Sequence, residues 1–188
     1  TTLALVAQGD DADAITAAAE RGVPIVGICG GYQMLADEIV DTEAVEAPTP
    51  TRADGLGLLP IAVTFETAKR TGVVTGEWRG QGVEGYEIHH GVARLRSADE
   101  DDPRSAQPEP FLDGWQVGHV WGTTWHGAFE NDGFRRAFLT QVAEVTGSRW
   151  QPGDTPGFRA RREEMLERLA DVVVEHLDTG SLRRLIGL

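Results

Sequence analysis

An apolar run that ends in a pair of glycines, residues 23–35, constrains this chain more than any other stretch. Its sequence, VPIVGICGGYQML, predicts a buried strand that turns directly into a helix. Cys29, the only cysteine of the chain, lies at that turn, with Gly27 two residues before it and Gly31 two residues after it. This spacing is typical of a nucleophile elbow, in which small residues let the backbone turn sharply and hold the nucleophile at the strand tip. The stretch therefore predicts a reactive cysteine.

The environment expected at such an elbow favours the thiolate. Because the free N–H groups and the dipole at a helix N-terminus stabilise negative charge, we expect the pKa of the Cys29 thiol to fall and its reactivity to rise. The alternative is a small buried cysteine at a strand end, which has no chemical role. The two flanking glycines favour the nucleophile.

The composition limits the classes of protein that fit. A chain of 188 residues with 40% hydrophobic composition suffices for one good core, so we expect one domain with an appendage. A single cysteine excludes an intrachain disulfide. No apolar run approaches the ~20 residues that span a bilayer, and the first residues show no signal-peptide features. We therefore expect a cytoplasmic protein without a membrane partner. The formal charge of −13 repels a phosphate backbone and excludes nucleic acid as a partner.

Helix and strand patterns alternate around the elbow and predict an α/β fold. An alanine-rich helix is expected over residues 12–21, ended by Gly22 and followed by the strand that leads to the cysteine. Residues 71–95 predict short antiparallel strands joined by glycine turns, and residues 115–125 predict one strand. A helix is expected from about Gly133. The result is an open sheet of mixed or parallel strands flanked by helices, with reactive groups at the carboxyl ends of the strands.

The chain is expected to contain two regions. Residues 1–150 would form the core, and residues 151–188 a helical extension packed on the same domain. Pro156 lies near the start of the expected tail helix, and Gly180 marks its end. Apolar residues at helical spacing predict the inner face of this helix: Met165, Leu166, Leu169, Val172, Val173 and Leu177.

A cysteine nucleophile needs a base, and the chain offers five histidines. His176 falls on the surface of the tail helix, and His119 falls inside the expected strand, where a histidine is more often structural. His126 follows the end of that strand, which is the geometry that presents a base toward another strand tip. His89 and His90 also follow an expected strand. Position therefore favours His126 and leaves the His89 and His90 pair open.

Four ordered motifs extend this pattern from residue 27 to residue 135. They are GICGGYQML (27–35), GLGLLP (55–60), GYEIHHG (85–91) and GTTWHGAFENDGFR (122–135). In these motifs the chain resembles the class I (triad) glutamine amidotransferases, specifically the C-terminal glutaminase domains of the cobyric acid synthase family. The resemblance implies a flavodoxin-like α/β domain that releases ammonia from glutamine.

The resemblance also implies a role for each candidate site residue. Cys29 would be the nucleophile and His126 its partner, while Gln33, one helical turn beyond the nucleophile, would lie beside the bound glutamine. The backbone N–H of Gly30 would donate one hydrogen bond to the oxyanion. His89 would either line the glutamine pocket or satisfy a buried polar contact.

Further expectations concern partners. The resemblance implies that the ammonia passes to an ATP-dependent synthetase domain, upstream or on a separate chain, which amidates corrinoid carboxylates in cobalamin biosynthesis and converts adenosylcobyrinic acid a,c-diamide to cobyric acid. The chain has no Gly-x-x-x-x-Gly-Lys-Ser/Thr loop, so we expect ATP and Mg²⁺ in that separate domain and no metal or cofactor in this one. Two alternatives stay open. One is a free-standing amidotransferase subunit for lipid II, and the other is a non-catalytic, truncated interaction module.

The sequence departs from the family pattern in two places. Triad amidotransferases in general place a glutamate two residues after the histidine, where this chain has Ala128, and the cobyric acid synthases resemble this sequence in lacking that glutamate. Another group must then orient His126, and Glu130 and Glu87 are the candidates. The family's first strands, and the loop that supplies the second oxyanion N–H, are expected before residue 12 and have no convincing counterpart there. We therefore expect the fold to lack its first strands.

Overall fold

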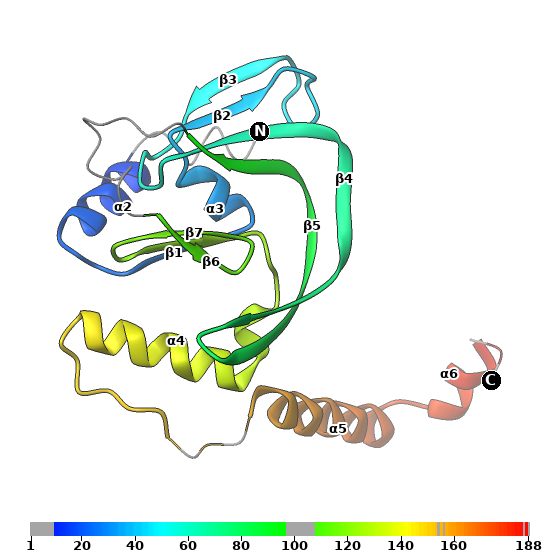
Figure 1. The fold of residues 1–188 in the computed structure, drawn as a ribbon. Helices are drawn as coiled ribbons and strands as arrows, with labels where there is room; N and C mark the ends of the chain where they lie inside the picture. Colours follow the sequence, from blue (N-terminus) through cyan, green and yellow to red (C-terminus); the bar gives the residue numbers. More distant parts are fainter. Residues whose placement is uncertain (1–9, 97–107, 154, 156, 186, 188) are drawn as a thin grey trace. The chain divides into compact units, whose positions relative to one another are not determined.

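The computed structural model describes residues 10–96, 108–153, 155, 157–185 and 187. The chain divides into two compact units, Thr1–Pro152 and Gly153–Leu188 (Figure 1). The described strands of the first unit form two open, four-stranded sheets of mixed direction, flanked by helices. The predicted α/β class with open, mixed sheets is confirmed, although these strands form two sheets and not one.

The first sheet carries the elbow. Its strand order is β1-β8-β7-β6, with the bounds Ile25–Ile28 (β1), Val120–Thr123 (β8), Gly114–Val117 (β7) and Glu109–Phe111 (β6). β1 and β8 run parallel, with Ile28 opposite Thr123, and the other pairs are antiparallel. Because the carboxyl ends of parallel strands meet at one edge of a sheet, the segments that follow β1 and β8 emerge side by side.

The prediction of a single strand over residues 115–125 is wrong. The chain turns between β7 and β8 at Gly118, whose φ of +55° suits a residue without a side chain. His119 therefore lies in a turn and not inside a strand. Its carbonyl accepts a hydrogen bond of 2.9 Å from the Ile25 N–H, which ties this turn to the start of β1.

The second sheet has the order β3-β2-β4-β5. Its strands are Thr51–Asp54 (β3), Glu38–Asp41 (β2), Ile61–Trp78 (β4) and Gln81–Leu95 (β5). β2 pairs in parallel with β4, and the other pairs are antiparallel. β4 and β5 form one long hairpin that turns at Arg79 and Gly80 and curves strongly along its length (Figure 1).

The antiparallel pairing predicted over residues 71–95 is confirmed, but the prediction of short strands is wrong, because β4 and β5 are long. Gly80 does lie in a turn, but two of the other glycines lie where β4 and β5 approach other segments. A Cβ at Gly76 would lie 2.9 Å from the ring of Trp125, and a Cβ at Gly85 would lie 2.6 Å from the carbonyl oxygen of His126. A strand glycine commonly marks such a close approach.

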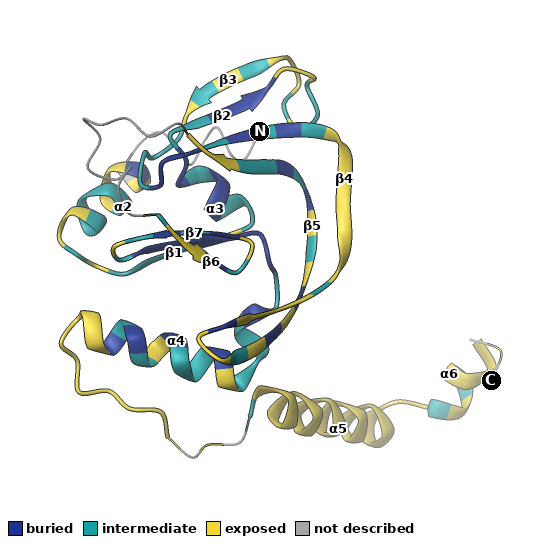
Figure 2. Cartoon of the chain, viewed as in Figure 1, coloured by how far each residue is buried: buried dark blue, intermediate teal, exposed yellow. Residues whose placement is uncertain are grey.

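The helices of the first unit cover these sheets. They are α2 (Asp10–Glu20), α3 (Gly30–Met34) and α4 (Asp132–Val145), with a 3₁₀ helix, η1, at Ala128–Glu130. The two predicted helices are confirmed as α2 and α4. Figure 2 shows the buried positions on α3, the strands and α4. One core cluster is aromatic (Trp78, Phe111, Trp121, Trp125, Phe134 and Phe138), and the other packs around α3 (Tyr32, Leu35, Leu59, Ile61 and Val63).

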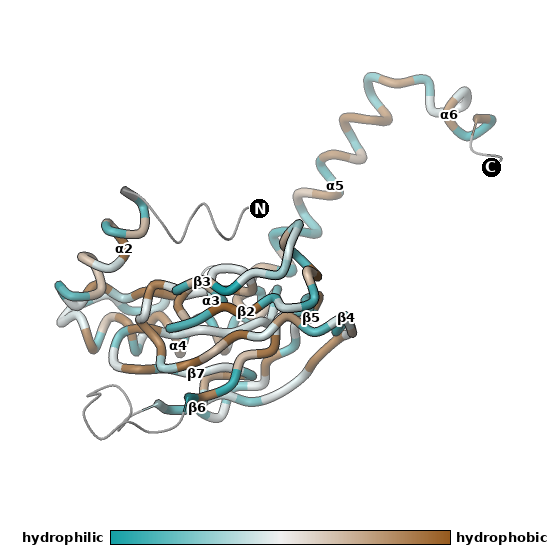
Figure 3. The backbone as a smooth tube through the Cα atoms, turned by 90° about the horizontal axis from the view of Figure 1, so that it is seen from above, coloured by the Kyte–Doolittle hydropathy of each residue, from teal (hydrophilic) through white to brown (hydrophobic). Residues whose placement is uncertain are grey.

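The second unit contains α5 (Phe158–His176) and α6 (Thr179–Leu185). Gly180 lies inside α6 and does not end the tail helix as predicted, because Asp178 accepts hydrogen bonds from the Ser181 N–H and hydroxyl and so starts a new helix. Pro156 lies outside the described residues. Apolar and polar residues alternate along α5 (Figure 3), and the side chains expected on its inner face are exposed in the described structure. That residues 151–188 pack on the core stays a prediction.

No helix in the described part of the chain combines the length and the apolar composition needed to cross a membrane.

Candidate active site

Cys29 occupies the predicted elbow between β1 and α3. Its backbone adopts φ 51° and ψ −112°, a strained conformation for a residue with a side chain and one that is concentrated at functional sites. The Cys29 N–H donates to the Thr123 carbonyl at 2.8 Å, which fixes the elbow to the end of β8. A Cβ at Gly27 would lie 2.8 Å from the Gly31 carbonyl, whereas a Cβ at Gly31 would meet nothing within 4 Å. The turn thus requires glycine at position 27 and not at position 31.

The pKa of the Cys29 thiol is shifted in the direction opposite to the one predicted from the sequence. Burial raises the pKa of the Cys29 thiol above its ordinary value, a hydrogen bond from the Gly30 N–H lowers it in part, and the carboxylates of Glu46 and Asp113 raise it further. The predicted fall is wrong because burial and the two carboxylates together outweigh the hydrogen bond from the Gly30 N–H. The resting thiol therefore needs a base to remove its proton.

His126 follows β8 at the same sheet edge. Its backbone forms an isolated antiparallel bridge with Tyr86 of β5, in which His126 N–H donates to the Tyr86 carbonyl at 2.8 Å and Tyr86 N–H donates to the His126 carbonyl at 3.0 Å. The structure thus brings Cys29 and His126 to the ends of adjacent parallel strands. The Nε2 atom of His126 is buried and has no hydrogen-bond partner among the described residues.

The two carboxylates considered as orienting groups for His126 do not bond to its Nε2. Glu87 lies 3.3 Å from Nε2 of His89 and pairs with that histidine. Glu130 ends η1, beyond Ala128, whose side chain is buried in the core. No carboxylate among the described residues holds Nε2 of His126, so another feature orients the ring.

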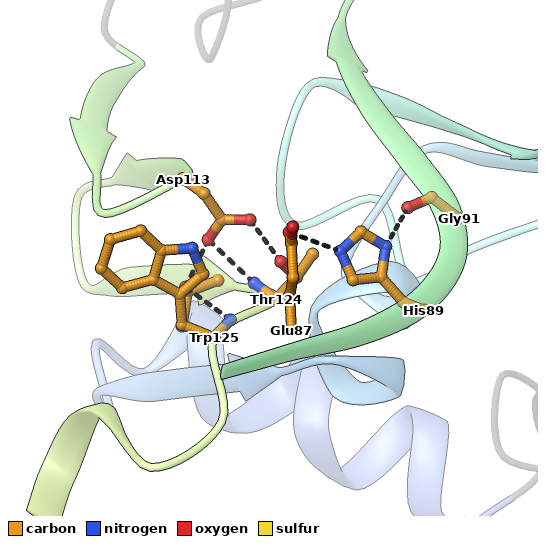
Figure 4. A network of polar contacts seen from close by, with 7 residues as sticks. Glu87, His89, Gly91, Asp113, Thr124 and Trp125 are labelled. Carbon is orange, nitrogen blue, oxygen red and sulfur yellow. Dashed lines mark hydrogen bonds and ion pairs between the residues drawn. The ribbon is translucent and has the colours of Figure 1, made fainter. Parts of the chain in front are cut away.

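Asp113 is a residue of this site that sequence reasoning missed (Figure 4). It lies in the turn between β6 and β7, and its carboxylate accepts hydrogen bonds from the Thr123 hydroxyl at 2.5 Å and the Thr124 N–H at 3.0 Å, as well as from the Thr124 hydroxyl. Its charge also raises the pKa of Cys29 and, after the larger effect of burial, that of Tyr32. The Asp-Gly pair at 113–114, a common hairpin signal, could have located the turn but not its neighbours.

Gln33 and His89 meet at Gly91. Gln33 is buried on α3, and a Cβ at Gly91 would lie 2.4 Å from its side-chain Nε2. His89 is also buried, with Nδ1 2.7 Å from the Gly91 carbonyl and Nε2 facing Glu87 (Figure 4). The described contacts satisfy both ring nitrogens of His89 within the protein, and its role in binding glutamine stays a prediction.

Comparison with known proteins decides the family. A family profile described as the CobB/CobQ-like glutamine amidotransferase domain matches residues 2–134. The chain belongs to this family. Cobyric acid synthases of Cutibacterium acnes and Streptomyces coelicolor are each 48% identical to it, over 177 and 175 residues that make up 93% of this chain. The cobyric acid synthase of Mycolicibacterium vanbaalenii is 41% identical over 172 residues, or 92% of this chain.

These alignments cover 34%, 32% and 32% of the three relatives, so this chain spans about a third of their length. The family resemblance predicted from the four motifs is confirmed. The roles assigned to Cys29, Gly30, Gln33, His89 and His126 stay predictions.

The remaining histidines lie elsewhere in the amidotransferase chain. Nδ1 of His90 lies 3.0 Å from the Glu66 carbonyl, His119 occupies the turn before β8, and His176 ends α5 in the second unit. Among the described residues, no group of three or more His, Cys, Asp or Glu side chains is arranged to hold a metal ion.

Proposed function

We propose that this domain hydrolyses glutamine at Cys29 with His126 as general base and acid. His126 takes the thiol proton, and the Cys29 sulfur attacks the side-chain amide carbon of glutamine. The backbone N–H of Gly30, which already donates toward the sulfur, stabilises the oxyanion. His126 then returns the proton to the leaving ammonia, and a thioester remains on Cys29.

The second half of the reaction regenerates the enzyme. His126 removes a proton from water, the resulting hydroxide attacks the thioester, and glutamate leaves as the sulfur recovers its proton. The net reaction converts glutamine and water into glutamate and ammonia. Gln33 and His89 would line the glutamine site beside the nucleophile.

One observation carries this proposal. Cys29 lies at a strained strand-to-helix turn, and its N–H donates to the carbonyl of Thr123, the last residue of β8. His126 follows Thr123 by three residues, and β8 runs parallel to β1, which carries Cys29 at its end. Burial and two carboxylates favour the protonated thiol, which becomes a nucleophile when a base removes its proton. The elbow and the strand end supply these two parts together.

The relatives suggest where the ammonia goes. Because they are named cobyric acid synthase and are about three times as long as the matched region, the ammonia would serve an ATP-dependent synthetase domain outside this chain. ATP and Mg²⁺ would bind there, and the acceptor would be the corrinoid carboxylates of adenosylcobyrinic acid a,c-diamide. These names favour the corrinoid acceptor over lipid II and support a role in cobalamin biosynthesis. We expect the reaction to take place in the cytoplasm.

Labelling of Cys29 tests the hydrolytic step. Incubation with 6-diazo-5-oxo-norleucine, a glutamine-derived electrophile, should add one label to Cys29 in the natural full-length protein, and mass spectrometry of the peptide locates it. Cys29→Ala should take no label and release no glutamate, while folding as judged by circular dichroism. A folded wild-type protein that neither labels nor releases glutamate would overturn the proposal and favour the non-catalytic module.

A further inference from the structure

Glutamine hydrolysis by this site requires His126 to keep one orientation while it moves a proton from sulfur to ammonia. The residue two positions after His126 is Ala128, and no carboxylate in the described structure bonds to Nε2 of His126. The contacts that do hold the ring come from β5. The inference below rests on the proposed function.

The backbone of β5 is pressed against the segment that carries His126. Glycine at position 85 is what allows this approach, because a Cβ there would lie 2.6 Å from the His126 carbonyl oxygen. The two reciprocal hydrogen bonds of the Tyr86–His126 bridge then fix the backbone on both sides. The side chain of Asn131 adds a clamp, since its Oδ1 accepts from the Glu84 N–H at 3.2 Å and its Nδ2 donates to the Glu84 carbonyl at 2.7 Å.

The bridge places two rings face to face. The centroids of the Tyr86 and His126 rings are 4.9 Å apart, and their planes differ by 12°. Gly127, the residue after the histidine, adopts φ +72°, and a Cβ there would lie 3.8 Å from Cδ1 and Cε1 of Tyr86. The backbone at Gly127 therefore also lies close to the tyrosine ring. Stacking against a second ring restricts the rotation of the His126 ring about its own side-chain bonds.

We propose that Tyr86 is the positioning residue of His126, and that its stacked ring takes the place of the orienting carboxylate. The stack also suits the chemistry. When His126 takes the proton of the thiol, a positive charge develops over the face of the tyrosine ring, where the negative π cloud attracts it. Tyr86 touches neither substrate nor sulfur in this scheme and acts only through the histidine.

The variants Tyr86→Phe and Tyr86→Leu, made in the full-length protein, distinguish the effect of a stacked aromatic ring from the effect of an apolar side chain of any shape. Phenylalanine keeps the aromatic face, so we expect kcat for glutamine hydrolysis within about threefold of wild type. Leucine keeps an apolar side chain without that face, and we expect kcat to fall by about 10-fold to 100-fold with KM nearly unchanged. Ile88→Ala is the matched control, because Ile88 lies two residues along the same strand, on the same face, and is similarly exposed at 46% against 49% for Tyr86.

A spectroscopic readout tests the stack independently of turnover. The imidazole protons of His126 should appear upfield of those of the other four histidines, because they lie in the ring current of Tyr86, and Leu at position 86 should remove this displacement. Wild-type kcat in Tyr86→Leu, or His126 protons without the displacement, would overturn the inference. If Tyr86→Leu does not fold, the inference is tested by the displacement of the His126 protons in the wild-type spectrum and by the kcat of Tyr86→Phe. A wild-type protein that does not hydrolyse glutamine contradicts the proposed function, and the ring-current displacement then still shows whether Tyr86 holds the histidine.

Discussion

Cys29 and His126 are held in place by different parts of the chain. The position of Cys29 is set by its immediate neighbours, since β1 ends at Ile28 and α3 begins at Gly30. The position of His126 depends on β5, far earlier in the sequence, through the Tyr86–His126 bridge and the stacked rings. A short motif is therefore enough to place the nucleophile, whereas the base depends on tertiary structure. Substitutions in β5 should impair catalysis and leave the elbow intact.

The largest effect should come from Gly85→Ala. The added Cβ would meet the His126 carbonyl oxygen at 2.6 Å and the Ala128 nitrogen at 3.7 Å, so β5 must move away and the bridge must open. We expect kcat for glutamine hydrolysis to fall by about a hundredfold, because the base loses its orientation. Alkylation of Cys29 by iodoacetamide, at a pH high enough to ionise the thiol without the help of a base, should proceed as in wild type, because the elbow is untouched.

Gly82→Ala is the matched control for this variant. Gly82 lies on the same strand, and a Cβ there would meet nothing within 4 Å. We expect its kcat to stay close to wild type. An equal loss in both variants would mean that β5 tolerates no added side chain. A parallel loss of Cys29 alkylation in Gly85→Ala would mean that the two halves of the site are not independent.

The same comparison can be made at the elbow with Gly27→Ala and Gly31→Ala. A Cβ at Gly27 would lie 2.7 Å from Cδ1 of Leu35 and 2.8 Å from the Gly31 backbone, whereas a Cβ at Gly31 has open space. We expect Gly27→Ala to lower the free energy of unfolding by about 1–3 kcal/mol, a typical cost of overpacking. Gly31→Ala should leave it unchanged or raise it slightly, because alanine is the better helix former. Denaturant unfolding measures both, and equal stabilities would show that the elbow is not sterically set at Gly27.

The parts of the fold that sequence patterns predict correctly depend on residues close together in the chain. The spacing of Gly27, Cys29 and Gly31 predicts the elbow, and helical periodicity predicts α2 and α4. The long β4–β5 hairpin does not follow from such patterns. A glycine suits both a turn and a close approach, and only the tertiary structure shows that Gly76 and Gly85 are of the second kind.

The charge around the thiol is also a tertiary property. Asp113 comes from the β6–β7 turn and Glu46 from the loop after β2, and each raises the pKa of Cys29. The sequence around Cys29 reveals only the helix that follows it, which favours a shift in the opposite direction. Burial and carboxylates from distant segments outweigh the N–H groups of a helix of five residues.

A smaller effect is expected at Asp41, which anchors the loop that carries Glu46. Burial alone would raise the pKa of its carboxyl, but hydrogen bonds from the N–H groups of Ala47, Val45 and Glu46, and the nearby His90, together lower it below its ordinary value. Because the folded-state pKa is depressed, this stabilisation is complete above the unfolded-state pKa and is lost as the pH falls through the lower folded-state value. Asp41→Asn should therefore lower the free energy of unfolding by about 1 kcal/mol at neutral pH. In strong acid the difference from wild type should shrink, and a difference that does not change with pH would contradict the assignment to the carboxylate.

The smallest change expected is a shift in the reactivity of Cys29 in Asp113→Asn and Glu46→Gln. Each substitution removes a negative charge that disfavours the thiolate, so the pKa of Cys29 should fall in both and the midpoint of iodoacetamide alkylation should move to lower pH. Glu46→Gln should shift it at least as far, because the Glu46 carboxylate raises that pKa more than Asp113 does. An unchanged midpoint in both variants would leave burial as the only cause. A lowered midpoint in both would show that charges from two distant loops add to burial in keeping the thiol protonated, which is the state from which a base such as His126 must activate it.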